Sequence, residues 1–146
     1  MKYIAYGSNM VKEQMAFRCP DAKLVGIGHI EHARLEFYLH ATVEYSKIKS
    51  ARVPVAVWEI TKHDEQSLDR YEGVPNYYIK KRRLVRMADG SEIIGMIYIM
   101  KLKRPTPPVA SYYNDIVNAY TELGLDSAIK TILVPALRRS LRRKSR

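Results

Sequence analysis

The sequence predicts an α+β domain built on a small mixed or mostly antiparallel β-barrel with peripheral helices. Three observations lead to this prediction. Short apolar segments of strand length recur along most of the chain, Asp89-Gly90 between two of them is a hairpin signal, and three other segments carry helix caps or stops. The 146 residues suit a single domain, and 47% hydrophobic residues suffice for a core. No internal repeat or domain linker divides the chain.

The first half of the chain combines short strands with one helix. Strands are expected at residues 2–6, 23–30 and 33–39. Gly7-Ser8-Asn9 ends the first strand, and a helix is expected over 11–18, where Cys19-Pro20-Asp21 ends it. The polar segment 44–52 is expected to be a loop.

The second half begins with an apolar segment, 53–60, that predicts a buried strand. Pro54 favours a sheet edge or a strand start there. Thr61 can cap a helix that runs to about residue 71 and is ended by Gly73 and Pro75. The remaining expected elements are strands at 77–87 and 92–101, a stiff connection at 104–108, and a helix at 111–123 with Gly124 after its end.

Composition and charge narrow the function classes. One cysteine, Cys19, excludes an internal disulfide framework and a multi-cysteine zinc site. No apolar run reaches the ~18–20 residues of a membrane span, and the first residues show no secretory leader. We therefore expect a cytoplasmic protein without a membrane partner.

The formal net charge of +10 is concentrated at the C-terminus. Without the six cations of residues 138–146 it falls to +4. Leu137 and Leu141 lie one helical turn apart, so this tail is compatible with a basic amphipathic helix. It either contacts phosphates or is a solvated terminus, and the second interpretation is favoured because terminal charge runs are usually solvated. Nucleic acid is therefore not the expected partner.

Two segments are candidate sites, each with a structural alternative. Tyr6-Gly7-Ser8-Asn9 lies where a strand ends and a helix begins, so it is either an anion-binding turn of backbone N–H groups or an ordinary capped turn. Glu72 closes a helix, where the helix dipole disfavours a carboxylate and raises its pKa. It is either a general acid and base or a solvated acid that pairs with one of the many cations.

The order of several motifs resembles the γ-glutamylcyclotransferase family. The motifs are Tyr6-Gly7-Ser8-Asn9-Met10, the segment LDRYEGV at 68–74, Val57-Trp58, Tyr98-Ile99-Met100 and Pro107-Pro108 followed by Tyr112. The similarity spans residues 3–125, and it implies a γ-glutamylcyclotransferase-like domain at 1–130 followed by a basic tail at 131–146.

The resemblance also implies a reaction. A γ-glutamyl compound is cleaved by its own α-amine, which attacks the γ-carbonyl and releases 5-oxoproline, with no metal or organic cofactor. Glu72 would be the catalytic base and acid. The substrate-binding residues would be Tyr6, Gly7, Ser8, Asn9, Met10 and Tyr98, with the Tyr98 hydroxyl orienting Glu72 or the substrate.

Two other functions stay open at this point. One is a related enzyme that acts on other γ-glutamyl amines such as isopeptides, although Asn9 favours the branch that acts on γ-glutamyl amino acids. The other is a non-catalytic module of the same fold that uses the basic tail on nucleic acid or another polyanion.

Overall fold

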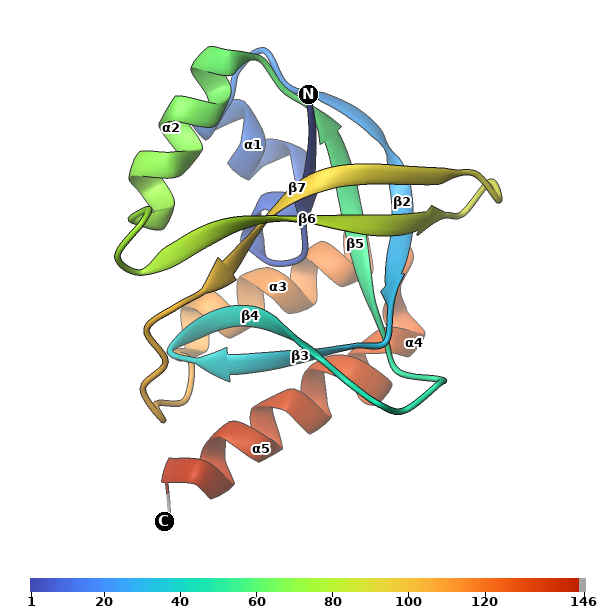
Figure 1. The fold of residues 1–146 in the computed structure, drawn as a ribbon. Helices are drawn as coiled ribbons and strands as arrows, with labels where there is room; N and C mark the ends of the chain where they lie inside the picture. Colours follow the sequence, from blue (N-terminus) through green and yellow to red (C-terminus); the bar gives the residue numbers. More distant parts are fainter. Residues whose placement is uncertain (145–146) are drawn as a thin grey trace.

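Five strands close into a barrel in the order β1-β5-β2-β6-β7 (Figure 1). The computed structural model describes residues 1–144. The barrel strands are β1 (Lys2–Ala5), β2 (Lys23–Glu31), β5 (Arg52–Glu59), β6 (Tyr78–Met87) and β7 (Glu92–Met100). Neighbouring strands are antiparallel except β1 and β7, which run parallel where Tyr3 lies opposite Met96. The predicted α+β fold with a small mixed barrel is confirmed.

The position of Pro54 in β5 follows from its missing N–H group. β5 pairs with β1 only from Ala56 to Glu59, whereas its pairing with β2 continues to Arg52. Pro54 therefore has a strand neighbour on one side only, where the absent donor interrupts no ladder. The expected edge-like environment of this proline is confirmed.

A two-stranded sheet packs beside the barrel, formed by β3 (Ala33–Tyr38) and β4 (His40–Tyr45). Here the sequence-based boundaries were wrong. Leu39 does not continue the first strand but makes the turn at φ 67°, and the following residues form a strand that reaches into the segment expected to be a loop. The single-residue turn between the strands carries no Gly or Asn, so no local turn signal marked it.

The first three helices lie where they were predicted, and the expected signals at Thr61, Gly73 and Gly124 are confirmed. α1 (Lys12–Arg18) follows a 3₁₀ turn at Ser8–Met10. α2 (Lys62–Glu72) begins with a capping box between Thr61 and Asp64 and ends at Gly73, whose φ of 66° lies in the left-handed region. α3 (Ala110–Glu122) is followed by Gly124 at φ 74°.

The chain then continues as a helical run, consisting of α4 (Asp126–Ala128), a π-helical turn (Ile129–Leu133) and α5 (Val134–Lys144). α5 lies along the β3–β4 sheet, so the predicted amphipathic helix is confirmed (Figure 1). Residue 130, where the sequence places the end of the domain, lies inside this run, and the division into domain and tail stays a prediction.

A buried ion cluster holds α5 against β3. Glu36 on β3 is 0% exposed, and its carboxylate pairs with Arg139 at 2.7 Å and Arg143 at 2.8 Å on α5, and with Arg34 at 2.7 Å. Arg139 and Arg143 also donate to the carbonyls of Leu35 and Phe37. The favoured interpretation of a solvated terminus is therefore wrong for these two tail arginines, because a buried carboxylate far away in the sequence attracts them.

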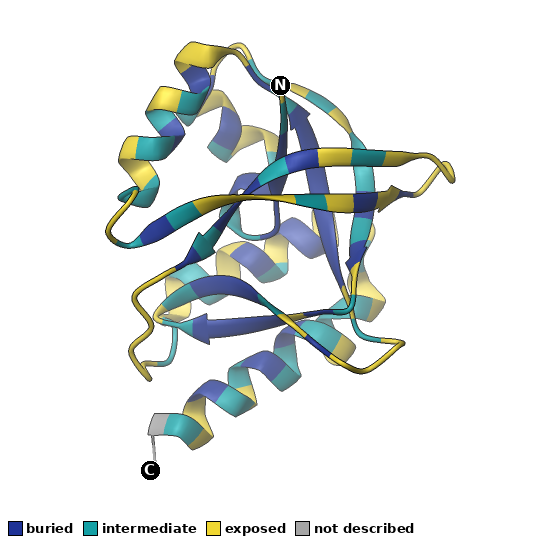
Figure 2. Cartoon of the chain, in the orientation of Figure 1, coloured by how far each residue is buried: buried dark blue, intermediate teal, exposed yellow. Residues whose placement is uncertain are grey.

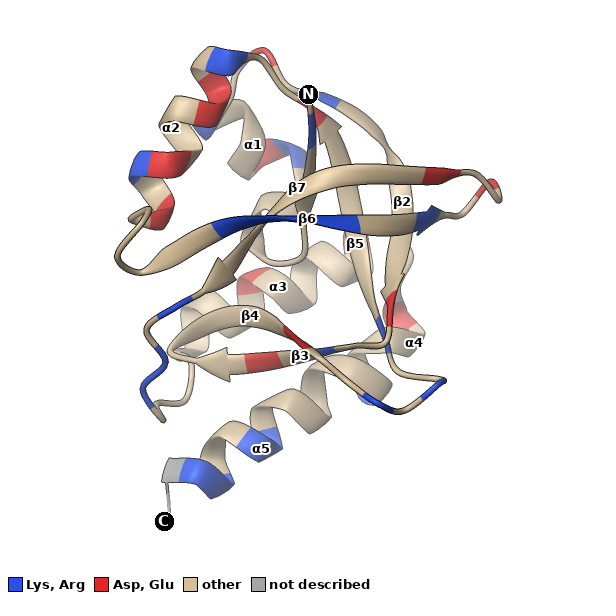
Figure 3. Ribbon diagram, viewed as in Figure 1, with Lys and Arg blue, Asp and Glu red and all other residues tan. Residues whose placement is uncertain are grey.

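A second basic cluster, formed by Lys80, Lys81, Arg82, Arg83 and Arg86, lies on β6 (Figure 3). Lys80 pairs with Glu65 and Asp69 on α2, and Arg86 pairs with Glu31 and Glu92. Within residues 1–144, no helix is long and apolar enough to cross a membrane.

The hydrophobic core fills the barrel and continues between the β3–β4 sheet and the helices beneath it (Figure 2). β5 is buried along six consecutive residues, and α3 contributes Ile116, Ala119 and Tyr120. α3 packs against the 3₁₀ turn at Ser8–Met10 that follows β1.

Glu36→Gln should lower the free energy of unfolding by about 2–3 kcal/mol, because it leaves the partly buried guanidinium groups of Arg139 and Arg143 without their counter-charge. Urea unfolding measures the loss. Glu44→Gln is the matched control, since it breaks only the partly exposed pair with Lys103 and should cost about 1 kcal/mol or less. Equal losses in the two variants would contradict the role of the buried cluster.

Candidate active site

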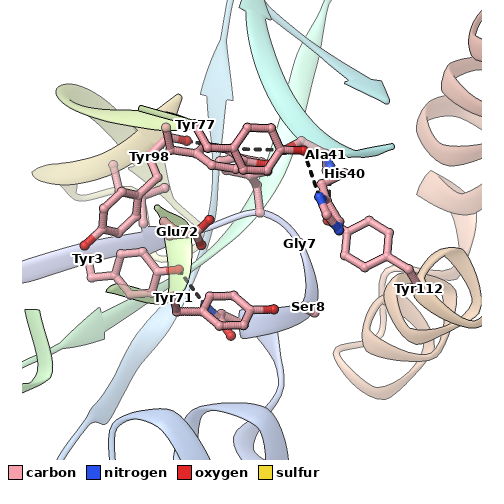
Figure 4. Close-up of a pocket in the computed structure, with 14 residues that line it drawn as sticks. Tyr3, Gly7, Ser8, His40, Ala41, Tyr71, Glu72, Tyr77, Tyr98 and Tyr112 are labelled. Atoms are coloured by element: carbon pink, nitrogen blue, oxygen red, sulfur yellow. Dashed lines mark hydrogen bonds between the residues drawn. The ribbon is translucent and has the colours of Figure 1, made fainter. Parts of the chain in front are cut away.

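A cavity of about 200 Å³ opens where β1 ends, and Glu72 shares its wall with the predicted turn (Figure 4). Half of the fourteen lining residues are tyrosines, drawn from both ends of the chain and its middle. The full lining consists of Tyr3, Ile4, Tyr6, Gly7, Ser8, Asn9, His40, Ala41, Tyr71, Glu72, Tyr77, Tyr78, Tyr98 and Tyr112. The structure therefore brings Glu72 together with Tyr6, Gly7, Ser8, Asn9 and Tyr98.

Met10 is the exception among the predicted site residues. The 3₁₀ turn, closed by the Met10 N–H to the Gly7 carbonyl at 3.1 Å, directs this side chain into the core, where it is 1% exposed. Met10 thus supports the turn from behind and does not line the cavity, and its contact with a substrate stays a prediction.

Glu72 is the last residue of α2, held there by the left-handed Gly73. Its side chain points into the cavity among the tyrosine rings (Figure 4). Within residues 1–144, the Glu72 carboxylate has no hydrogen-bond or ion-pair partner, and burial raises its pKa to about 7 against an opposing effect of the Arg18 charge. A carboxyl with this pKa can take up and release a proton near neutral pH.

Tyr98 lies on the cavity wall, but its hydroxyl has a different partner from the expected one. It donates to Asp69 Oδ1 at 2.6 Å, one helical turn before Glu72. Asp69 also pairs with Lys80 on β6. Tyr98 therefore connects β7 to α2 and does not orient the Glu72 carboxylate itself.

Tyr6 and Tyr78 fix the opposite wall through backbone carbonyls. The Tyr78 hydroxyl donates to the Ala41 carbonyl at 2.7 Å, and the Tyr6 hydroxyl donates to the carbonyl of Tyr98 at 2.5 Å. The Ala41 N–H in turn donates to the Tyr112 hydroxyl at 3.0 Å. Burial raises the pKa of the Tyr6 and Tyr112 hydroxyls, so these groups stay neutral near pH 7.

His40 reaches the cavity from the start of β4. Its Nδ1 lies 2.8 Å from the Tyr77 hydroxyl, and its ring packs edge to face on Tyr112 with centroids 5.0 Å apart (Figure 4). Burial lowers the pKa of His40, which keeps the imidazole neutral at physiological pH.

Sequence reasoning missed several of these residues. Tyr3 lies three residues before Tyr6, the first residue of the turn. The alternation of side chains along β1 could have predicted that Tyr3 faces the inside of the barrel. His40 and Tyr77 come from segments that carried no motif, and only the fold brings them to the cavity. The resemblance already included Tyr112, but not as a site residue.

The anion-binding interpretation of the turn rests on backbone geometry. Gly7 has φ −123°, so the turn does not use the left-handed freedom of glycine. A Cβ at this position would lie 3.6 Å from the Tyr112 hydroxyl, inside the lined cavity. The absence of a side chain at Gly7 therefore keeps backbone and cavity in direct contact.

Glu72→Gln should stabilise the protein at pH 8 by about 1–3 kcal/mol, because it removes a buried charge that lacks a partner. The folded state holds the Glu72 proton more tightly than the unfolded chain, so the wild type loses stability as pH rises from the ordinary pKa of a glutamate to about 7. The gain should therefore disappear near pH 4. Urea unfolding at several pH values measures it, with Glu122→Gln at the exposed end of α3 as control. An unchanged or lower stability of the Glu72→Gln variant at pH 8 would contradict the buried, unpaired carboxylate.

Comparison with known proteins agrees with this fold. Bovine and human proteins named γ-glutamylcyclotransferase are each 27% identical over 134 residues, which cover 84% of this chain and 71% of the relative. A solved structure titled "Gamma-glutamyl cyclotransferase" superposes with a TM-score of 0.77 at 26% identity, covering 98% of this chain and 85% of that one. The structure of YkqA from Bacillus subtilis, 18% identical with a TM-score of 0.72 over 90% of this chain and 53% of its own, shares the fold.

These similarities confirm the resemblance stated from the sequence. The match to a family profile covers residues 52–129, which include β5, α2, β6 and β7 and thus the segment that carries Glu72. The chain belongs to the AIG2-like family.

Proposed function

We propose that this protein is an enzyme of the γ-glutamylcyclotransferase type, which releases 5-oxoproline from a γ-glutamyl amino acid or γ-glutamyl amine. The observation that carries the proposal is the Glu72 carboxylate, which lines the cavity beside the Tyr6–Asn9 turn without a partner of its own within residues 1–144. The relatives named γ-glutamylcyclotransferase support the same reaction. The cavity of about 200 Å³ is smaller than the ~300–1,000 Å³ of drug-sized ligand sites, which suits a substrate built on one amino acid.

The reaction needs no external nucleophile. The α-amine of the substrate attacks its own γ-carbonyl carbon, a five-membered ring closes, and the bond to the leaving nitrogen breaks. Intramolecular attack has a high effective concentration, so the task of the protein is to fold the substrate and move protons. The α-nitrogen loses two of its three ammonium protons, and the leaving nitrogen gains two protons and departs as an ammonium, so protons balance.

Glu72 is the proposed proton carrier. As a carboxylate it accepts a proton from the substrate ammonium, and as a carboxylic acid it returns that proton to the leaving nitrogen. A pKa of about 7 makes both directions accessible near neutral pH. The neutral tyrosines and the neutral His40 around it add no competing charge.

The backbone N–H groups of Gly7, Ser8 and Asn9 are proposed to bind the substrate carboxylate or the oxyanion that forms at the γ-carbonyl. Such donors stabilise charge that develops during the reaction, provided that they are fixed in advance. The Asn9 side chain supports this, because its Nδ2 donates to Tyr3 and its backbone carbonyl accepts from Trp58 Nε1 at 3.0 Å. Asn9 is therefore proposed to act through its backbone.

The alternative of a non-catalytic module that binds a polyanion has less support. Arg139 and Arg143, two of the six tail cations, face inward to Glu36 and to backbone carbonyls. The charge available for phosphate contacts is correspondingly smaller. That nucleic acid is not a partner stays a prediction.

Glu72→Gln should lower the release of 5-oxoproline at least ~10²–10⁴-fold, because Gln can neither accept nor donate the transferred proton. The assay measures the 5-oxoproline released from a panel of γ-glutamyl dipeptides, glutathione and γ-glutamyl-lysine. The compounds that react also show which amine the enzyme releases. Glu122→Gln, at the exposed C-terminal end of α3, is the matched control and should keep wild-type turnover. Near-normal turnover in the Glu72→Gln variant would sink the proposal.

The rate constant kcat/KM should fall as pH drops through about 7, because the free enzyme needs Glu72 as a carboxylate. Activity is thus present above this pH and lost below it. His40→Gln tests whether this titration belongs to Glu72. The pH at which kcat/KM falls on the acid side (the acid limb) should be the same in this variant as in the wild type, even where the rate itself differs. A limb that moves or disappears in His40→Gln would assign the titration to the histidine.

A further inference from the structure

Arg18, at the C-terminal end of α1, connects two parts of the cavity wall that lie far apart in the sequence. Its Nη1 donates to Asn9 Oδ1, and its Nη2 donates to the Tyr71 hydroxyl at 2.6 Å. The guanidinium carbon also lies 3.7 Å from the centroid of the Tyr71 ring. One planar group therefore holds the turn after β1 and the last turn of α2 at the same time.

Both partners of Arg18 lead directly to the proposed chemistry. Asn9 is 4% exposed, and its Nδ2 donates to the hydroxyl of Tyr3 at 3.0 Å. Asn9 thus connects Arg18 to a tyrosine on the cavity wall. Tyr71 immediately precedes Glu72, and its exposed ring borders the cavity (Figure 4). The distance between the Tyr6–Asn9 turn and Glu72 thus depends on where Arg18 places its two donors.

Arg18 also differs in charge from the groups around Glu72. The titratable groups that line the cavity with Glu72 within residues 1–144 come from β1 and the turn after it, from β4, β6, the residue before β6, β7, α2 and α3, and they are Tyr3, Tyr6, His40, Tyr71, Tyr77, Tyr78, Tyr98 and Tyr112. Burial keeps the inner tyrosines neutral by raising their pKa, and it lowers the pKa of His40. Asp69, one turn back on α2, is paired with Lys80. Arg18 is the cation in this part of the described chain whose field opposes the burial of Glu72.

We propose that Arg18 is a positioning residue of this site, whose guanidinium fork, held on Asn9 and on Tyr71 next to Glu72, fixes the Tyr6–Asn9 turn against the end of α2 and places a positive charge near Glu72. Its effect on turnover rests on the function proposed above, whereas its effect on Glu72 itself does not.

An arginine fits both tasks better than a lysine. The guanidinium is planar and presents several N–H donors in fixed directions, so it can donate to Asn9 and Tyr71 while stacking on the ring. A lysine ammonium supplies a similar charge on a flexible stem without the fixed fork. Arg18→Lys therefore separates the geometric part of the proposal from the electrostatic part, and Arg18→Gln removes both.

The test is a titration of the Glu72 side-chain carboxyl carbon by NMR in the wild type, Arg18→Gln and Arg18→Lys. The midpoint should rise by about one unit in Arg18→Gln and stay close to the wild-type value in Arg18→Lys. Arg70→Gln is the matched control, because Arg70 is an arginine in the last turn of α2 whose side chain donates to Ser67 and, within residues 1–144, to neither Asn9 nor Tyr71. A Glu72 midpoint in Arg18→Gln that moves no more than in Arg70→Gln would overturn the electrostatic part.

Kinetics test the geometric part. If 5-oxoproline is released, Arg18→Lys should raise KM several-fold with an unmoved acid limb, and Arg18→Gln should lower kcat/KM about tenfold at pH 6 and less at pH 9. A wild-type KM in Arg18→Lys would refute the positioning role. If no substrate of the panel reacts with the wild type, the proposed function fails, and the titration still decides the influence of Arg18 on Glu72.

A variant that keeps the core intact covers the case in which Arg18→Gln does not fold. Tyr71→Phe removes one acceptor of the fork from a ring that is 51% exposed. The Glu72 midpoint should then rise by a smaller amount than in Arg18→Gln, because the guanidinium is held at one point instead of two. A wild-type midpoint in Tyr71→Phe would overturn the proposal in that case.

Discussion

The closure of the barrel at β1 is the constraint on which the candidate site depends. β1 has only four residues, yet it pairs with β5 on one side and meets β7 on the other, so both of its edges are fixed. Closure requires a close approach, because a Cβ on Gly95 of β7 would lie 2.9 Å from Ile4. The chain must leave the barrel directly after Ala5, and the Tyr6–Asn9 turn is therefore placed over the open end of the barrel by the strand pairing itself.

The end of α2 is brought to the same place by contacts of a different kind. The capping box at Thr61 sets where the helix begins, and the left-handed Gly73 sets where it ends. Between these points Asp69 is tied to Tyr98 of β7 and Lys80 of β6, which fixes the helix on the barrel wall. These contacts of Asp69 fix the end of the helix. Glu72 therefore reaches the cavity although its carboxylate accepts no hydrogen bond within residues 1–144.

The predictability of each feature follows from how local its signal is. The Thr61 cap, Gly73, the Asp89-Gly90 hairpin and Gly124 act over a few residues, and the elements that they delimit were predicted. Tyr6 to Asn9 and Glu72 belong to short motifs in a fixed order, so a resemblance could identify them. By contrast, the turn at Leu39, the position of His40 and the partner of the Tyr98 hydroxyl are set by contacts between distant segments. Arg139 and Arg143 lie 103 and 107 residues from Glu36 in the sequence. The number of charges in the tail therefore could not predict their pairing with Glu36.

The buried Glu36 and the half-buried Glu72 illustrate how surroundings assign different tasks to one residue type. Glu36 is enclosed by three guanidinium groups, which satisfy both of its oxygens and fix α5 on β3. The arginine near Glu72 within residues 1–144 is Arg18, and its guanidinium donates hydrogen bonds to Asn9 and Tyr71 instead of to the Glu72 carboxylate. A direct pair between Arg18 and Glu72 would favour the ionised carboxylate further and hold it away from a substrate. Arg18 acts on Glu72 through space and through neighbouring residues. The oxygens of the Glu72 carboxylate therefore stay available to a substrate, and its pKa of about 7 suits proton transfer near neutral pH.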